Sequence, residues 1–81
     1  ATEWQYRYLD AVMADPDQHL PLLLEAERLL TRLPYGMAPR DASSLALQED
    51  LYRAITRTLF DQERFLDALY YSEKGKQQLL V

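Results

Sequence analysis

A single histidine is the residue of this chain best suited to acid–base chemistry. His19 lies two residues after Asp17 and two before Pro21, in a segment that we expect to be a loop. Because histidine titrates near neutral pH, His19 together with Asp15 and Asp17 could form an acid–base group. However, no serine, cysteine or lysine lies at helical spacing from His19 to act as a nucleophile. We therefore interpret His19 as a structural or neutral surface histidine.

Metal and phosphate sites need donor patterns that this sequence lacks. A metal site needs three or four converging ligands, and there is no cysteine, no Glu-x-x-His and no pair of histidines. Glu25 and Glu27 stand two apart on a predicted helix and therefore point to different sides. With glycine only at Gly36 and Gly75, there is no glycine-rich phosphate loop. We expect no enzyme, no bound metal and no cofactor.

The composition predicts an all-α protein with one small domain over residues 1–81. Good helix formers dominate the chain, and 48% of its residues are hydrophobic, which is too many for a disordered protein. A chain of 81 residues buries about 60–65% of its unfolded surface, so the expected core is modest.

Net charge, the length of the apolar runs and the absence of cysteine indicate which partners and which location to expect. Thirteen acidic against nine basic residues give a net charge of −4, and such a domain repels a phosphate backbone. The longest apolar runs, of four residues at 11–14 and 68–71, are far too short for a membrane span, and nothing marks secretion. The absence of cysteine fits a reducing cytosol. We expect a cytoplasmic protein that binds neither nucleic acid nor a membrane.

Hydrophobic periodicity predicts four helices in two antiparallel hairpins. We place them at residues 3–14, 21–33, 42–60, and from Gln62, capped by Asp61, to residue 77 or beyond. The second helix could begin at Pro16 with an irregular first turn. We prefer a start at Pro21, because proline suits the first position of a helix and costs about 3 kcal/mol deeper inside. Thr2 is the expected cap of the first helix, and Asp41, Ser43 and Ser44 are candidate caps of the third.

Each predicted helix has a stripe of residues that we expect to be buried. The stripes are Trp4, Tyr8, Ala11 and Val12; Leu22, Leu23, Ala26, Leu29, Leu30 and Leu33; Leu45, Tyr52, Ile55 and Leu59, with Leu51 at the margin; and Phe65, Ala68, Ser72, Gly75 and Leu79. Two prolines and a glycine mark residues 34–39 as a connecting loop. The alternative for this segment is a binding loop that presents Tyr35 and Met37.

The last two predicted helices resemble a tetratricopeptide repeat over residues 48–81. The matching positions are Tyr52, Ile55, Thr56 and Leu59 in the first helix and Phe65, Ala68, Ser72 and Gly75 in the second. Thr56 replaces the usual small residue, Ser72 replaces a large aromatic residue, and Leu80 stands where proline is common. The small residues Ala68 and Gly75 would let the two helices approach closely. A generic helical hairpin is the alternative.

Arg53, Arg57 and Phe60 share a face of the third helix that is distinct from its core stripe. The resemblance implies that this face lines a groove for extended peptides, in which basic side chains bind a carboxylate. The alternative is a solvated face on which Glu49 pairs with Arg53.

Two further apolar rows exceed what a small core needs. Tyr6, Leu9 and Met13 lie opposite the core stripe of the first helix, and Leu66 and Tyr70 lie on the outer side of the fourth. These rows either pack on one another or form an exposed patch for a homodimer or another partner.

Together these features predict a protein–protein interaction module, such as a small adaptor, chaperone or regulatory domain. Its partner would be another protein or peptide, or a second copy of the chain. A helical piece of a permanent assembly is a rival within this class. The alternative from a different class is a ligand-sensing or catalytic helical bundle with a pocket near His19 and Tyr35.

Overall fold

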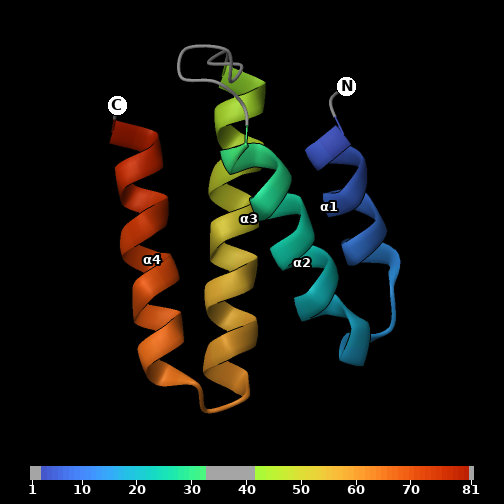
Figure 1. Ribbon diagram of the computed structural model, residues 1–81, viewed down its shortest axis with the longest axis vertical. Helices are drawn as coiled ribbons and strands as arrows, with labels where there is room; N and C mark the ends of the chain where they lie inside the picture. Colours follow the sequence, from blue (N-terminus) through green and yellow to red (C-terminus); the bar gives the residue numbers. More distant parts are fainter. Residues whose placement is uncertain (1–2, 33–41, 81) are drawn as a thin grey trace. The chain divides into compact units, whose positions relative to one another are not determined.

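The computed structural model describes residues 3–32 and 42–80, which form four α-helices and no strand (Figure 1). The helices are α1 (Glu3–Met13), α2 (Pro16–Thr31), α3 (Ala42–Asp61) and α4 (Phe65–Leu80). The chain divides into two compact units, Ala1–Arg40 and Asp41–Val81. In the first unit α1 packs against α2, and in the second α3 packs against α4. The predicted all-α fold of four helices in two hairpins is confirmed, whereas a single domain over the whole chain stays a prediction.

Several predictions fall outside the described residues. They concern the caps at Thr2 and Asp41, the core position Leu33, the side chain of Leu79, and the loop that contains Tyr35 and Met37. Ser43 and Ser44 do not cap the third helix, because they lie inside α3, which begins at Ala42.

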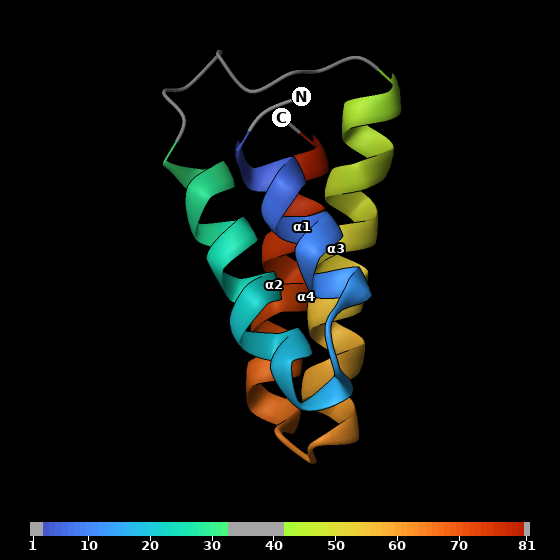
Figure 2. The ribbon, with the colours of Figure 1, turned by 90° about the vertical axis from the view of Figure 1, so that its right-hand side faces the viewer.

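In the first unit, α1 and α2 lie side by side (Figure 2). Trp4 and Ala11 are buried with 1% exposure each, and Tyr8 is half-buried. Val12 was expected in the same stripe but is 57% exposed. Eight residues after Trp4, it lies about 80° around the helix from that side chain. Because α1 has one neighbour within its unit, its buried stripe is narrow and Val12 falls outside it.

The start of α2 corrects the sequence-based prediction, because the helix begins at Pro16 and not at Pro21. Pro16 stands in the first turn, where its missing N–H would have no partner in the helix. The first turn closes through a hydrogen bond of 2.8 Å from the Gln18 amide to the Asp15 carbonyl. Pro21 then interrupts one hydrogen bond inside the helix. Burial of Leu20, which is 7% exposed, helps to offset that loss.

One side of α2 carries the apolar residues of its stripe. Leu23, Ala26 and Leu30 are buried there, with Leu22 and Leu29 half-buried. Among polar residues of the helix, Glu27 is also buried, with 5% exposure, which the hydrophobic pattern did not predict.

An exposed ion pair lies on another face of α2. The Arg28 guanidinium donates hydrogen bonds to both carboxylate oxygens of Glu25, one of them 3.0 Å long. These bonds hold the pKa of Glu25 below its ordinary value. Whatever stability this pair contributes is therefore present above the ordinary pKa of glutamate and is lost as the pH falls through the lowered one. Because the pair is exposed, we expect that contribution to be small.

In the second unit, the core of α3 is broader than predicted. Tyr52, Ile55 and Leu59 are buried as expected, and Leu45 is half-buried. Leu51 was placed at the margin but has no exposed surface. Leu51 precedes Ile55 by one helical turn, so both side chains project from the same side of α3. That side is the centre of the buried face of α3, and not its edge.

The turn between α3 and α4 closes with the backbone hydrogen bonds of a Schellman motif. The amide of Arg64 donates to the Leu59 carbonyl at 2.9 Å. The amide of Glu63 donates to the Phe60 carbonyl at 3.0 Å. Glu63 has a φ of 60°, in the left-handed region that glycine usually occupies at this position. Backbone bonds therefore satisfy the last carbonyls of α3 and reverse the chain.

This turn corrects the predicted start of α4. Gln62 does not begin α4 with Asp61 as its cap, because both residues belong to the end of α3 and its turn. Phe65 is the first residue of α4 and is 54% exposed, although it was expected in the core. It lies at the end of the hairpin, where its ring stacks edge-on against Phe60 with 5.0 Å between the ring centroids.

At Gly75, α4 packs closely against α3. A Cβ atom on this residue would lie 2.8 Å from the Cβ of Tyr52 and 3.0 Å from its Cγ. Ala68, two turns earlier on the same side of α4, is also buried, with 4% exposure. The prediction that a small residue permits close packing is therefore confirmed at Gly75. Ala68 is buried as predicted, and Ser72 between them is half-buried.

We predict that Gly75→Ala lowers the free energy of unfolding by about 1 kcal/mol. The new methyl group overlaps Tyr52 and should cost about 1–3 kcal/mol, against which alanine regains up to about 1 kcal/mol of helix propensity. Urea unfolding followed by circular dichroism measures the difference. Gln77→Ala, an exposed change in the same helix, should stay within about 0.5 kcal/mol. A Gly75→Ala protein that is more stable than the wild type would show that the helices do not touch there.

We predict that Glu63→Gly raises the free energy of unfolding by about 0.5–1 kcal/mol. Glycine adopts a φ of 60° without the steric cost that a glutamate side chain brings, and the exposed Glu63 side chain has no ion pair or hydrogen bond within the described residues. The measurement is the melting temperature. Gln62→Gly, one residue earlier, should lower it. Equal effects of the two substitutions would contradict the left-handed turn.

Candidate functional site

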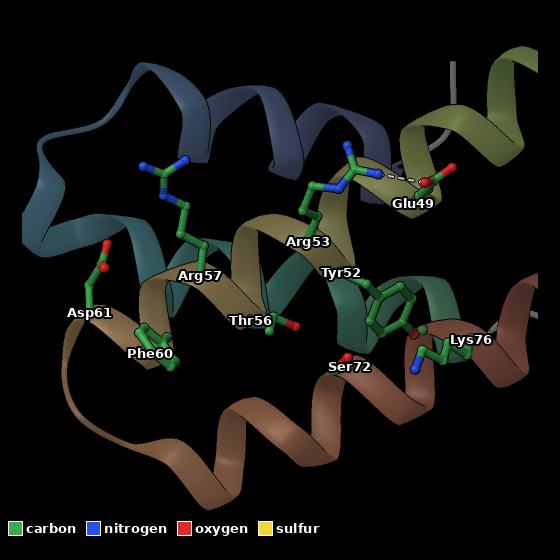
Figure 3. Close-up of a pocket in the computed structure, with 10 residues that line it drawn as sticks. Glu49, Tyr52, Arg53, Thr56, Arg57, Phe60, Asp61, Ser72 and Lys76 are labelled. Carbon is green, nitrogen blue, oxygen red and sulfur yellow. Dashed lines mark hydrogen bonds and ion pairs between the residues drawn. The ribbon is translucent and has the colours of Figure 1, made fainter.

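A groove of about 500 Å³ runs between α3 and α4 within the second unit. It is open along one side, and Figure 3 shows the residues that line it. They are Glu49, Tyr52, Arg53, Thr56, Arg57, Phe60 and Asp61 of α3, and Ser72, Gly75 and Lys76 of α4.

The floor of the groove is mainly apolar. Tyr52 is buried beneath it with 3% exposure, held there by the close approach of Gly75. Thr56 and Ser72 are half-buried on the two facing helices. Phe60 is 60% exposed at the turn end of the groove. An open apolar ring of this kind offers a binding surface for an apolar side chain.

The two arginines of the groove differ in their surroundings. Arg53 donates a hydrogen bond of 2.6 Å to Glu49, and its other terminal nitrogen lies 4.0 Å from Asp50. Arg57 makes no ion pair or hydrogen bond within the described residues. On the opposite wall, Lys76 forms an ion pair with Glu73, with 3.5 Å between Nζ and Oε1. Arg57 is therefore the groove cation that is available to a ligand without first breaking an ion pair.

The three residues predicted from the α3 sequence are brought together by the structure, since Arg53, Arg57 and Phe60 all line this groove. The pair between Glu49 and Arg53 that was the alternative interpretation is also present. The wall from α4 was missed as part of a site, since Ser72 and Gly75 were assigned to the core. The available signal for that wall was Gly75 followed by Lys76 in α4.

The apolar rows predicted on α1 and α4 are exposed. In the first unit, Tyr6 is 59%, Leu9 53% and Met13 88% exposed. In the second unit, Leu66 is 84% and Tyr70 58% exposed.

The outer face of α4 holds more aromatic and apolar surface than was predicted. Leu69, which the sequence did not single out, is 59% exposed. Tyr70 stacks edge-on against Tyr71 with 5.0 Å between centroids. The Lys74 ammonium lies 5.9 Å from both ring centroids, within the range of a cation–π contact.

His19 has a structural contact in this fold. Its Nε2 lies 2.8 Å from the carbonyl oxygen of Ala14, the residue that follows α1. Tyr35, the other residue of the alternative pocket, is outside the described residues. Within residues 3–32 and 42–80 there is no group of three or more metal-binding side chains. None of the helices described is long and apolar enough to cross a membrane.

No family model, curated protein or solved structure matches the chain. The similarity to a tetratricopeptide repeat therefore stays a prediction from residues 48–81.

Proposed function

We propose that this chain is a protein–protein interaction module whose α3–α4 hairpin binds an extended peptide of a partner protein. The observation that supports this proposal is the groove of about 500 Å³, which combines an apolar floor with charged side chains on its rim. Ligand pockets commonly have volumes of about 300–1,000 Å³ and this mixture of surfaces. The groove is open rather than closed, so it suits a chain that enters and leaves along its length.

The rim favours a partner that carries a carboxylate. Arg57 is free of ion pairs among the described residues, and Arg53 stands one helical turn away. A carboxylate that reached both would gain charge-assisted hydrogen bonds. The net charge of −4 slows the approach of an acidic partner without preventing binding. The resemblance to tetratricopeptide repeats supports the same function, and with it a role as a cytoplasmic adaptor, chaperone or regulatory domain.

The groove is tested by selecting displayed random peptides against the intact chain and measuring their affinities for variants. Ser72→Trp fills the space between the helices and should abolish binding. Arg53→Ala combined with Arg57→Ala should weaken binding by about 2 kcal/mol with little loss of stability. Gln77→Trp, on an exposed position of the same helix, is the matched control for Ser72→Trp. If the selected peptides bind the Ser72→Trp protein with unchanged affinity, the groove is not their binding site.

The exposed apolar rows favour a second candidate function, which is self-association. Tyr6, Leu9 and Met13 form a continuous row along α1 that is more than half exposed at every position. Leu66 and Tyr70 form a corresponding row on α4. Apolar rows of this kind mark contact surfaces when they are contiguous. A homodimer through either row would leave the α3–α4 groove as a separate feature.

We expect Leu9→Glu to shift an oligomer of this protein toward the monomer, because a buried unpaired carboxylate opposes association. Sedimentation velocity at several protein concentrations measures the change. Gln18→Glu adds the same charge at an exposed position of α2 and is the control. Leu66→Glu makes the same test of the row on α4. A wild-type protein that stays monomeric at all concentrations would contradict self-association.

A further inference from the structure

The groove rim carries two opposite charges that do not pair with each other. Arg57 and Asp61 stand four residues apart at the end of α3. No ion pair within 4.0 Å joins either side chain to another described residue. Figure 3 shows both side chains extending from the same side of α3.

Arg57 and Asp61 have the less favourable order for an ion pair four residues apart on a helix. On a helix, an acidic residue four positions before a basic one forms the better pair, and the reverse order is weaker. Glu49 and Arg53 have the favourable order and form a hydrogen bond of 2.6 Å. Arg57 and Asp61 have the reverse order and remain unpaired in the same helix.

Asp61 also stands where the helix does not favour an acid. The carboxyl end of a helix carries a partial negative charge, which repels a carboxylate in the last turn. The nearest basic residue along the turn, Arg64, is hydrogen-bonded to Asp67 at 2.8 Å and is therefore engaged elsewhere. The described contacts give Asp61 no stabilising role in the hairpin.

The spacing of the two charges matches that of an extended peptide. Four residues of α-helix rise about 6 Å. In an extended chain, side chains two residues apart lie on the same side and are separated by about 6.6–6.8 Å. One face of such a peptide can therefore meet Arg57 and Asp61 together. Phe60 lines the same groove, with its ring on the side of α3 that faces α4.

We propose that the groove selects an extended peptide in which an acidic and a basic side chain stand two residues apart. The acidic side chain binds Arg57, and the basic one binds Asp61. This inference rests on the proposed function of the same groove and specifies its ligand. Each exposed ion pair should contribute about threefold to affinity, and the two together about tenfold.

The test uses synthetic nine-residue peptide pools with acetylated and amidated ends, neutral except for a central Asp-x-Lys. Comparison pools replace the aspartate by asparagine, the lysine by glutamine, or both, or place the two charges side by side. A further pool keeps a free carboxyl end. Fluorescence anisotropy measures affinity for the wild-type chain, Arg57→Gln, Asp61→Asn and Ser72→Trp, with circular dichroism as the check on folding.

We expect the wild-type chain to bind the Asp-x-Lys pool about tenfold more tightly than the doubly neutral background. Asp61→Asn should remove the advantage of lysine over glutamine and keep that of aspartate over asparagine. Arg57→Gln should remove the advantage of aspartate over asparagine and keep that of lysine over glutamine. This crossed pattern requires each rim residue to contact its own peptide charge. A general loss of stability would not produce the pattern.

Other outcomes separate this inference from the proposed function. If Ser72→Trp abolishes binding but neither rim variant changes the charge preferences, the groove binds peptides and the charge pattern is wrong. The same conclusion follows if only peptides with a free carboxyl end bind, or if adjacent charges bind more tightly. If no pool binds, or if binding survives Ser72→Trp, both the charge pattern and the proposed function are wrong.

Discussion

The second unit depends on the contact between Gly75 and Tyr52. The absence of a side chain at one position lets α4 approach α3 until its backbone reaches the Cβ of a buried tyrosine. The tyrosine ring is thereby fixed under the groove, and the side chains further along α3 are left to form the rim. A larger residue at position 75 would separate the helices, so the same contact sets both the stability of the hairpin and the width of the groove.

Much of the helical arrangement follows from the sequence, because the apolar spacing of α2 and α3 is strong. The errors lie at boundaries and edges, where tertiary structure outweighs local preference. Pro21 was preferred as a helix start, but a proline can be accepted inside α2 when leucines close to it, here Leu20 and Leu23, are buried. Val12 and Phe65 have the periodicity of core residues and are exposed, because each lies beyond the reach of the single helix that its own helix packs against.

The sequence predicted one wall of the groove, from α3, and not the other. Arg53, Arg57 and Phe60 share a face of one helix, and periodicity within a helix is visible in a sequence. The opposite wall comes from α4, and its position depends on the hairpin register, which no local pattern specifies. The sequence also did not show which arginine forms an ion pair. Arg53 is paired and Arg57 is not among the described residues, although both have acidic residues nearby.

The turn at Glu63 has a practical consequence for experiments on this protein. The hydrogen bonds that close it come from backbone atoms, so the side chains at Gln62 and Glu63 are not needed to hold it. Both are exposed, and the chain contains no cysteine. A single cysteine introduced at Gln62 would therefore be a unique reactive thiol. A fluorophore or spin label attached there would report on the end of the hairpin from outside the groove.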